Sequence, residues 1–337
     1  MRTYTGIQAM RGVAAISVVC GHAVTMRFGL GIPPDVALGA LYILQAGVDV
    51  FFVISGFIIA TSAAANPSPV TFAWRRAVRI FPVYWLVLAA AVVSAQWIDV
   101  FPRAPYFSYQ INGLYLLSLT TENWYVAPAW SLCYELYFYA AVLVILAISP
   151  AYVFEVLLAA LAFVIAADVF NIPLGIYSEP IVLEFGLGVL IAFAVRIKFT
   201  PGFPLIAIGL SAALFYTGWH YINKGQSSGG LRLLTYGMGS ACLIYAVVLA
   251  EHRGARFPVL MQRLGDVSYS LYLSHHLLMT WLSLGAVSWL PGPLQIAGWI
   301  ALAVTLASFM HRFVEKPLLR WSHRVGAPIN AAPLQSY

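Results

Sequence analysis

The sequence predicts an all-helical protein that crosses a membrane about ten times. Of its 337 residues, 61% are hydrophobic and only 9% are charged, whereas soluble domains carry about 25% charged residues. Windows of about 20 apolar residues are long enough to span a bilayer. Ten such windows cover residues 7–27, 37–63, 81–98, 128–148, 151–168, 180–196, 203–222, 233–250, 267–290 and 294–312. We expect residues 1–320 to form one transmembrane domain and residues 321–337 a short cytoplasmic tail. The aromatic residues 106–119 are expected to lie at the membrane surface or to re-enter the membrane.

The positions of lysine and arginine predict that both termini are cytoplasmic, because cytoplasmic loops are enriched in these residues. With that orientation the inner loops and tails hold Arg2, Arg75, Arg76, Arg79, Arg196, Lys198, Arg253, Arg256, Arg263, Arg312, Lys316, Arg320 and Arg324. The outer loops hold Arg27, Arg103, Lys224 and Arg232, and Arg11 falls inside the first span. The net charge of +6 therefore reflects topology and attraction to anionic membrane lipid, not nucleic-acid binding.

The first span, residues 7–27, contains Arg11 and His22. Eleven residues correspond to about three helical turns, so both side chains leave the same face, ~16 Å apart along the axis. A neutral histidine can accept and return a proton at neutral pH, which suits a general base. The alternative is a histidine bonded to a neighbouring carbonyl, with Arg11 reaching to the inner surface.

The second span contains Asp49 near mid-membrane, followed by Ser55 and Gly56. A carboxylate at that depth must be paired or protonated, and Arg11 and His22 on the neighbouring helix are the expected partners. Gly47, Ser55 and Gly56 would also allow close helix packing.

The inner loop before the third span holds Arg75, Arg76 and Arg79. Their spacing of three and four residues would cluster the guanidinium groups on one face, where they could grip a phosphorylated ligand. Anchoring of the loop at the inner surface is the simpler alternative.

The fourth span opens with Trp130, Glu135 and Tyr137. Its aromatic residues could form a belt at the membrane interface or a surface that binds sugar. Glu135 lies at a depth similar to that of His22, so it could orient the imidazole or bind an acceptor hydroxyl.

The ninth span carries Ser268, Tyr272 and His275 at positions i, i+4 and i+7, which predicts a polar stripe on one helical face. Such a stripe either lines a cavity or joins helices by hydrogen bonds.

Several other types of site are not indicated. The three cysteines all fall in predicted spans without the Cys/His spacing of a metal site, so no metal is expected. Gly186 and Gly188 lie inside a span and do not form a dinucleotide-binding turn. Signatures of phosphate-binding loops, zinc proteases and serine hydrolases are missing from the sequence.

Six motifs together resemble the acyltransferase-3 family. They are Arg11 with His22, GVDVFFVISGF, RRAVRIFP, WSLCYELYFY, DVSYSLYLSH and VEKP, and they occur in the family's order over residues 7–320. The resemblance implies a ten-helix enzyme of the bacterial inner membrane that transfers an acyl group, usually acetyl, from cytosolic acyl-CoA to a carbohydrate hydroxyl. Stand-alone members of this length resemble exopolysaccharide O-acetyltransferases.

The resemblance also implies roles for individual residues. His22 matches the family's essential histidine and Arg11 its paired arginine, while Arg75, Arg76 and Arg79 match the motif implicated with the CoA nucleotide. Asp49, Ser55, Glu135 and His275 match further motif positions. Leu136 and Tyr137 stand where the family often has a second acidic residue and a glutamine.

These observations combine into one hypothesis. The CoA phosphates bind at the inner arginines and Ser55 lies beside the donor, with its thioester near His22. Asp49 or Glu135 orients the imidazole, which deprotonates a glycan hydroxyl held by Trp130, Tyr137, Tyr272 and His275. A proton-coupled solute transporter is the alternative, because intramembrane ionisable residues also form proton paths. The sequence leaves homo-oligomerisation open.

Overall fold

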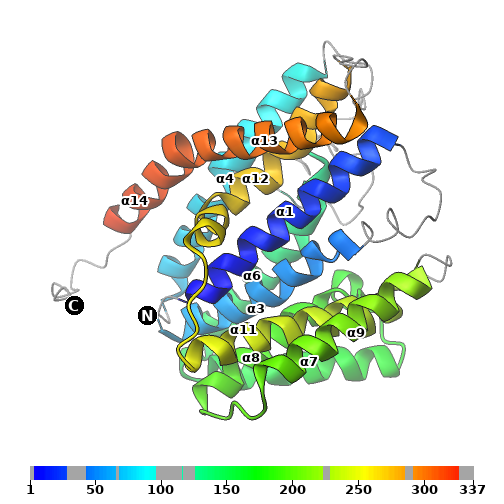
Figure 1. Cartoon of the computed structure of the whole chain (residues 1–337). Helices are drawn as coiled ribbons and strands as arrows, with labels where there is room; N and C mark the ends of the chain where they lie inside the picture. Colours follow the sequence, from blue (N-terminus) through cyan, green and yellow to red (C-terminus); the bar gives the residue numbers. More distant parts are fainter. Residues whose placement is uncertain are drawn as a thin grey trace.

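The computed structural model describes residues 4–28, 43–65, 68–95, 116, 126–222, 228–284 and 291–325. Over these ranges the chain forms helices and turns without a β-strand, so the prediction of an all-helical fold is confirmed there (Figure 1). Except for Leu116, the aromatic stretch of residues 106–119 lies outside the described residues.

Eleven helices make up most of the described chain. They are α1 (Thr5–Phe28), α3 (Gly47–Ala65), α4 (Pro69–Ser94), α6 (Trp130–Ile148), α7 (Val153–Val169), α8 (Val182–Arg196), α9 (Pro204–Ile222), α11 (Met238–His252), α12 (Val259–Leu284), α13 (Gly292–Met310) and α14 (Lys316–Val325). Shorter elements join them: η1 (Ala127–Ala129), η2 (Pro150–Tyr152), η3 (Gly175–Ser178), α10 (Gly229–Arg232), and two π-helical turns, η4 (Leu233–Gly237) and η5 (His311–Glu315).

Within the described ranges, seven helices are long and apolar enough to cross a membrane. They are Thr5–Arg27, Gly47–Ala65, Pro69–Ser94, Ala127–Ile148, Pro150–Val169, Gly229–His252 and Gly292–Ser322. The predicted spans at 180–196, 203–222 and 267–290 correspond to the helices α8, α9 and α12, which are not among the seven. The chain is a membrane protein, while the count of ten spans, the cytoplasmic termini and the division at residue 320 stay predictions.

Helix α4 begins a full twelve residues before the predicted start at residue 81. Pro69 occupies the first turn, where a missing N–H costs nothing, and Ser68 caps the helix by accepting a hydrogen bond from the Thr71 N–H at 3.3 Å. Pro82 lies inside the helix and does not end it, as neighbouring helices can compensate for a proline within a membrane. The arginine motif therefore lies on a helix and not, as predicted, in a loop.

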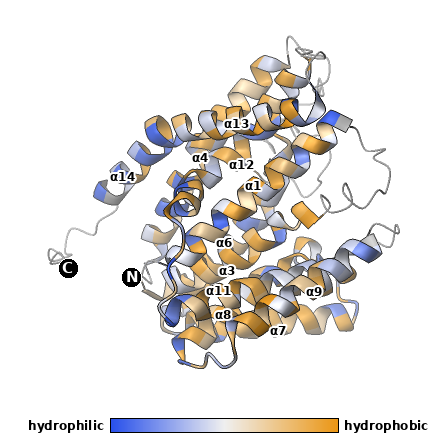
Figure 2. Ribbon diagram, viewed as in Figure 1, coloured by the Kyte–Doolittle hydropathy of each residue, from blue (hydrophilic) through white to orange (hydrophobic). Residues whose placement is uncertain are grey.

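The helices are arranged around α1 and α3, which lie in the middle of the bundle (Figure 1). Helices α12 and α13 lie on one side of this pair, and α7, α8, α9 and α11 lie on the other. Helix α1 begins, and α14 ends, on the same side of the bundle. Figure 2 shows hydrophobic residues along most helices and a concentration of hydrophilic residues on α14.

Glycines bring the central helices into close contact, as predicted. A Cβ added to Gly56 of α3 would lie 2.0 Å from the Phe185 carbonyl oxygen of α8, and one on Gly47 would lie 2.5 Å from the Ala14 carbonyl oxygen of α1. Between α12 and α1, a Cβ added to Gly265 would lie 1.9 Å from the Gln8 carbonyl oxygen. Close contact between α1 and α12 is what brings the predicted site residues of these two helices together.

Candidate active site

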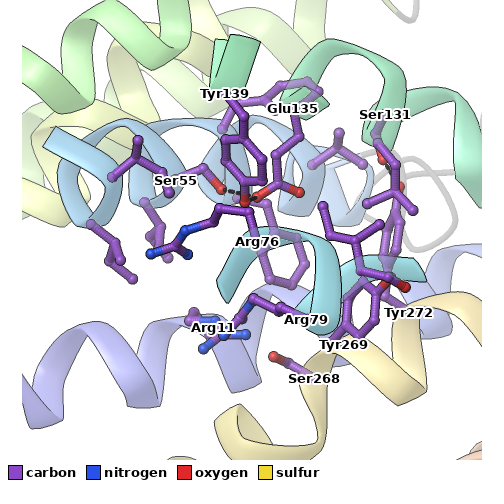
Figure 3. A pocket seen from close by; sticks show the side chains of 18 residues that line it. Arg11, Ser55, Arg76, Arg79, Ser131, Glu135, Tyr139, Ser268, Tyr269 and Tyr272 are labelled. Carbon is purple, nitrogen blue, oxygen red and sulfur yellow. Dashed lines mark hydrogen bonds between the residues drawn. The ribbon is translucent and has the colours of Figure 1, made fainter. Parts of the chain in front are cut away.

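A cavity of about 160 Å³ lies among α1, α3, α4, α6 and α12 (Figure 3). Three arginines, Arg11, Arg76 and Arg79, and one carboxylate, Glu135, contribute to its wall. The remaining polar lining consists of hydroxyl groups, from Ser55, Ser131, Tyr139, Ser268, Tyr269 and Tyr272. The cavity is therefore a cationic chamber inside an otherwise apolar bundle, which suits an anionic ligand.

The arginine side chains come from two helices. The Arg11 Nη1 donates a hydrogen bond to the Gln8 Oε1 at 3.3 Å, one turn earlier on α1. Arg76 donates to the Ser62 Oγ at 3.3 Å, and its guanidinium lies over the rings of Phe72 and Tyr139. Arg75 does not line the cavity, so only two of the three arginines predicted to act together on α4 reach it.

Glu135 lies beside the arginines in the wall of the cavity. Its Oε1 accepts hydrogen bonds from the Ser55 hydroxyl at 3.2 Å and from the Tyr139 hydroxyl. The predicted contact between Glu135 and His22 is not found: Glu135 lines the arginine cavity, whereas His22 does not line it and is bonded to His275.

Tyr272 separates this cavity from a group of histidines. Its hydroxyl lies 2.8 Å from the Ser131 Oγ, and both residues line the cavity. One turn later on α12, the His275 ring lies 6.2 Å from the Tyr272 ring, measured between centroids. The polar stripe predicted on this span thus lines the cavity at Ser268 and Tyr272 and joins α12 to α1 at His275.

His22 of α1 is bonded to His275 of α12. The His22 Nδ1 lies 2.9 Å from the His275 Nε2, and the His275 Nδ1 lies 3.0 Å from the Leu271 carbonyl oxygen. His275 is fully buried, and the His276 ring contacts the His22 ring edge-on, at 5.7 Å between centroids. Two histidines that lie 253 residues apart in the chain thus form one hydrogen-bonded pair.

When both rings are neutral, the hydrogens of the pair can be assigned from these hydrogen bonds. A carbonyl oxygen only accepts, so the His275 Nδ1 carries a hydrogen and its Nε2 has the lone pair. The His22 Nδ1 must then donate to that lone pair. This leaves the His22 Nε2 without a hydrogen, as a free proton acceptor.

Asp49 does not meet Arg11 or His22, so its predicted pairing is wrong. Its two carboxylate oxygens accept from Arg232 Nε at 2.9 Å and Nη2 at 2.7 Å in a bidentate ion pair. Asp49 is fully buried, whereas the Arg232 side chain is 31% exposed. Arg232 lies at the end of the short helix α10 and not, as the sequence predicts, in an outer loop, and its side chain reaches Asp49 in the first turn of α3.

Two buried carboxylates outside the predicted set accompany these sites. Glu184 of α8 is fully buried close to the Asp49–Arg232 pair. Glu315 of η5 accepts from the Ser270 hydroxyl at 2.7 Å and contacts the His311 Nδ1 at 3.1 Å. Both could have been found by the criterion that selected Asp49, since each is an ionisable residue within or at the end of an apolar segment.

The predicted aromatic surface is divided between two contacts. Trp130 contacts Tyr134 and Phe52 edge-on, at 6.0 and 6.3 Å between ring centroids. The ring centroids of Tyr137 and Tyr177 of η3 are 6.1 Å apart, and the Tyr177 hydroxyl donates a hydrogen bond to the Tyr137 carbonyl oxygen at 3.1 Å. Tyr177 lies between two predicted spans, and burial raises the pKa of its phenol, so it remains a neutral donor.

Comparisons with known proteins identify the family. The acyltransferase-3 pattern, described as an acyltransferase domain, matches residues 4–312. The chain is similar to the "Exopolysaccharide production protein ExoZ" of Rhizobium meliloti (strain 1021), with 31% identity over 299 residues, covering 82% of this chain and 89% of the relative. It is also similar to the "Acyltransferase MdmB" of Streptomyces mycarofaciens, with 24% identity over 372 residues, covering 97% and 94% of the two chains. No solved structure matches. The chain therefore belongs to the acyltransferase-3 family and is a membrane-bound O-acyltransferase.

Proposed function

We propose that this enzyme transfers an acyl group, acetyl, from cytosolic acyl-CoA to a hydroxyl of an extracytoplasmic or lipid-linked glycan, and that it works in the bacterial inner membrane. The observation that carries the proposal is the hydrogen bond of 2.9 Å between the His22 Nδ1 and the His275 Nε2, from which we infer an unprotonated His22 Nε2. The relative named for exopolysaccharide production favours an exopolysaccharide as the acceptor.

The arginine cavity is proposed as the donor site. Phosphate groups bind guanidinium groups through charge-assisted hydrogen bonds, and Arg11, Arg76 and Arg79 supply three such groups in one chamber. The Glu135 carboxylate and the Ser55 hydroxyl lie in the same wall. We assign Glu135 to positioning these polar groups. Ser55 is assigned to the donor site, and Arg75 to its entrance.

His22 is proposed as the general base. It accepts the proton of the glycan hydroxyl on Nε2 while the hydroxyl oxygen attacks the thioester carbonyl carbon. The tetrahedral intermediate then collapses, the C–S bond breaks, and the imidazolium returns its proton to the departing thiolate. The products are the O-acyl glycan and free CoA, so atoms and charge balance without a covalent acyl-enzyme.

The acceptor is proposed to approach from the side of Trp130 and Tyr137. Aromatic faces stack well against sugar rings, and Trp130 begins α6, next to Ser131 and Tyr272 at the boundary of the cavity. Asp49 has a separate part in this scheme: through Arg232 it fixes α3 against the neighbouring segment α10.

Purified enzyme supplied with acetyl-CoA and a candidate glycan tests this proposal. We expect release of one free thiol for each O-acetyl group formed, with little release when the glycan is omitted. His22→Ala should lower the rate by about 10²- to 10⁴-fold, the usual contribution of a general base. His220→Ala on α9 is the matched control and should keep full activity. Full acetylation by folded His22→Ala would refute the assignment.

A further inference from the structure

A row of basic residues runs along the C-terminal helices η5 and α14. Arg312, Lys316, Arg320 and Arg324 are four residues apart and exposed. The first three line one hollow together with His311. These basic residues lie on the outer surface of the bundle, whereas the arginines of the donor cavity lie inside it.

The three cations that line the hollow have no counter-ion among the described residues. Within the part of the chain that the structure describes, Arg312, Lys316 and Arg320 form no ion pair and no hydrogen bond. The Arg312 guanidinium lies over the aromatic face of Phe313, 5.7 Å from the ring centroid. Three neighbouring positive charges repel one another, so an anion in the hollow would be stabilising.

The hollow lies where a lipid head group would be found. Arg312 follows Gly292, the first residue of α13, by 20 residues, and a helix of that length rises about 30 Å, the thickness of the hydrocarbon core. Phe309 and Phe313, which border Arg312, are 59% and 57% exposed, and their rings are 4.5 Å apart. Exposed aromatic rings at this depth face acyl chains, and the charges that follow them face phosphates.

Contacts with α4 hold this segment in place. The Trp74 ring lies 5.5 Å from the Trp321 ring, and the Trp74 Nε1 donates to the Ser322 carbonyl oxygen at 3.3 Å. Trp321 is 49% exposed, as suits a tryptophan at the membrane interface. The basic residues are thus presented by a docked helix.

We infer that Arg312, Lys316 and Arg320, with His311, form a binding site for the phosphate head group of an anionic phospholipid. The acyl chains of that lipid pack on Phe309 and Phe313. The site is separate from the donor cavity and does not depend on the proposed acyl transfer.

Native mass spectrometry of the full chain in detergent, titrated with phosphatidylglycerol or phosphatidylcholine, tests the site. We expect the wild type to retain phosphatidylglycerol in preference to phosphatidylcholine. R312Q/K316Q/R320Q should bind it about 100-fold more weakly, and R312Q or R320Q alone about 5-fold more weakly, since each surface cation contributes about fivefold. R312K/R320K keeps the charge and should retain binding. The control K198Q/R256Q/R263Q removes three other exposed cations and should bind as the wild type does.

Two results would overturn the inference. One is equal retention of phosphatidylglycerol by the wild type and by the glutamine variants. The other is release of the lipid by added CoA together with a raised KM for acyl-CoA in the glutamine variants, which would assign the hollow to the donor's phosphates. Loss of lipid preference with unchanged KM supports the lipid site whether or not the proposed glycan is the acceptor.

Discussion

The His22 Nδ1 lies 2.9 Å from the His275 Nε2, and this single contact links the first described helix of the chain to α12. His275 is in turn fixed by the Leu271 carbonyl one turn earlier on its own helix. The pair resembles the arrangement in which a second group orients a catalytic imidazole and selects its tautomer. Here that group is a neutral imidazole in place of a carboxylate.

The role of His275 can be tested through its acceptor nitrogen. His275→Ala removes the partner of the His22 Nδ1, so the imidazole can rotate or change tautomer, and we expect kcat to fall about 10- to 100-fold. KM for acyl-CoA should change little, because His275 does not line the donor cavity. His275→Gln offers an amide oxygen as acceptor and should restore part of kcat. The measurement is steady-state kinetics, with rates normalised to the concentration of folded protein. Equal kcat in wild type and His275→Ala would exclude a role of His275 in positioning His22.

Two arginines of the α4 motif, one that lines the cavity and one that does not, predict different effects on donor binding. Arg79 lines the cavity and Arg75 does not. Loss of a charge-assisted hydrogen bond costs about 1.5–3 kcal/mol, so Arg79→Gln should raise KM for acyl-CoA about 10- to 100-fold. Arg75→Gln removes the same charge one turn away and should have a much smaller effect. Similar KM increases in the two variants would instead favour a general surface-charge effect.

The Asp49–Arg232 pair predicts non-additive stability. Asp49→Ala leaves Arg232 near the buried Glu184, and Arg232→Ala leaves two buried carboxylates without their cation. Because the Arg232 side chain is 31% exposed, we expect each single substitution to cost about 2 kcal/mol, less than a fully buried pair.

The double variant Asp49→Ala/Arg232→Ala should be less destabilised than the sum of the single variants. Thermal unfolding of the purified proteins, followed by tryptophan fluorescence, provides the comparison. Strict additivity would show that the two residues do not stabilise each other.

Close packing between α3 and α8 makes Gly56 intolerant of a side chain. A Cβ at this position would lie 2.0 Å from the Phe185 carbonyl oxygen, so Gly56→Ala should destabilise the protein by about 1–3 kcal/mol. Gly209 of α9 has open space at its Cβ position, and Gly209→Ala should leave stability unchanged or raise it by up to about 1 kcal/mol. The midpoint of thermal unfolding measures both. A tolerated alanine at residue 56 would show that the two helices can separate without cost.

The sequence by itself determined the class of this protein and singled out several of the polar residues that line its cavity or form its histidine pair. Length and continuity of apolar runs are local properties, so they predicted helices at nearly every place where helices occur. The cost of an ionisable group inside a membrane is also local, and it drew attention to Arg11, His22 and Asp49 before any contact was known. Local signals were weaker at boundaries: the apolar run predicted a third span from residue 81, although Ser68 and Pro69 begin α4.

Only the tertiary structure decided which of these residues meet. Asp49 pairs with Arg232 across 183 residues of chain, and His22 with His275 across 253. Arg76 turns into the cavity while its neighbour Arg75 does not. Such contacts depend on which helices pack together, and Gly56 and Gly265 set that packing through close approach to distant backbone. The chemistry of a side chain follows from its residue type. Its partner depends on how the whole helix is rotated and which helices pack against it, and a local sequence pattern does not contain that information.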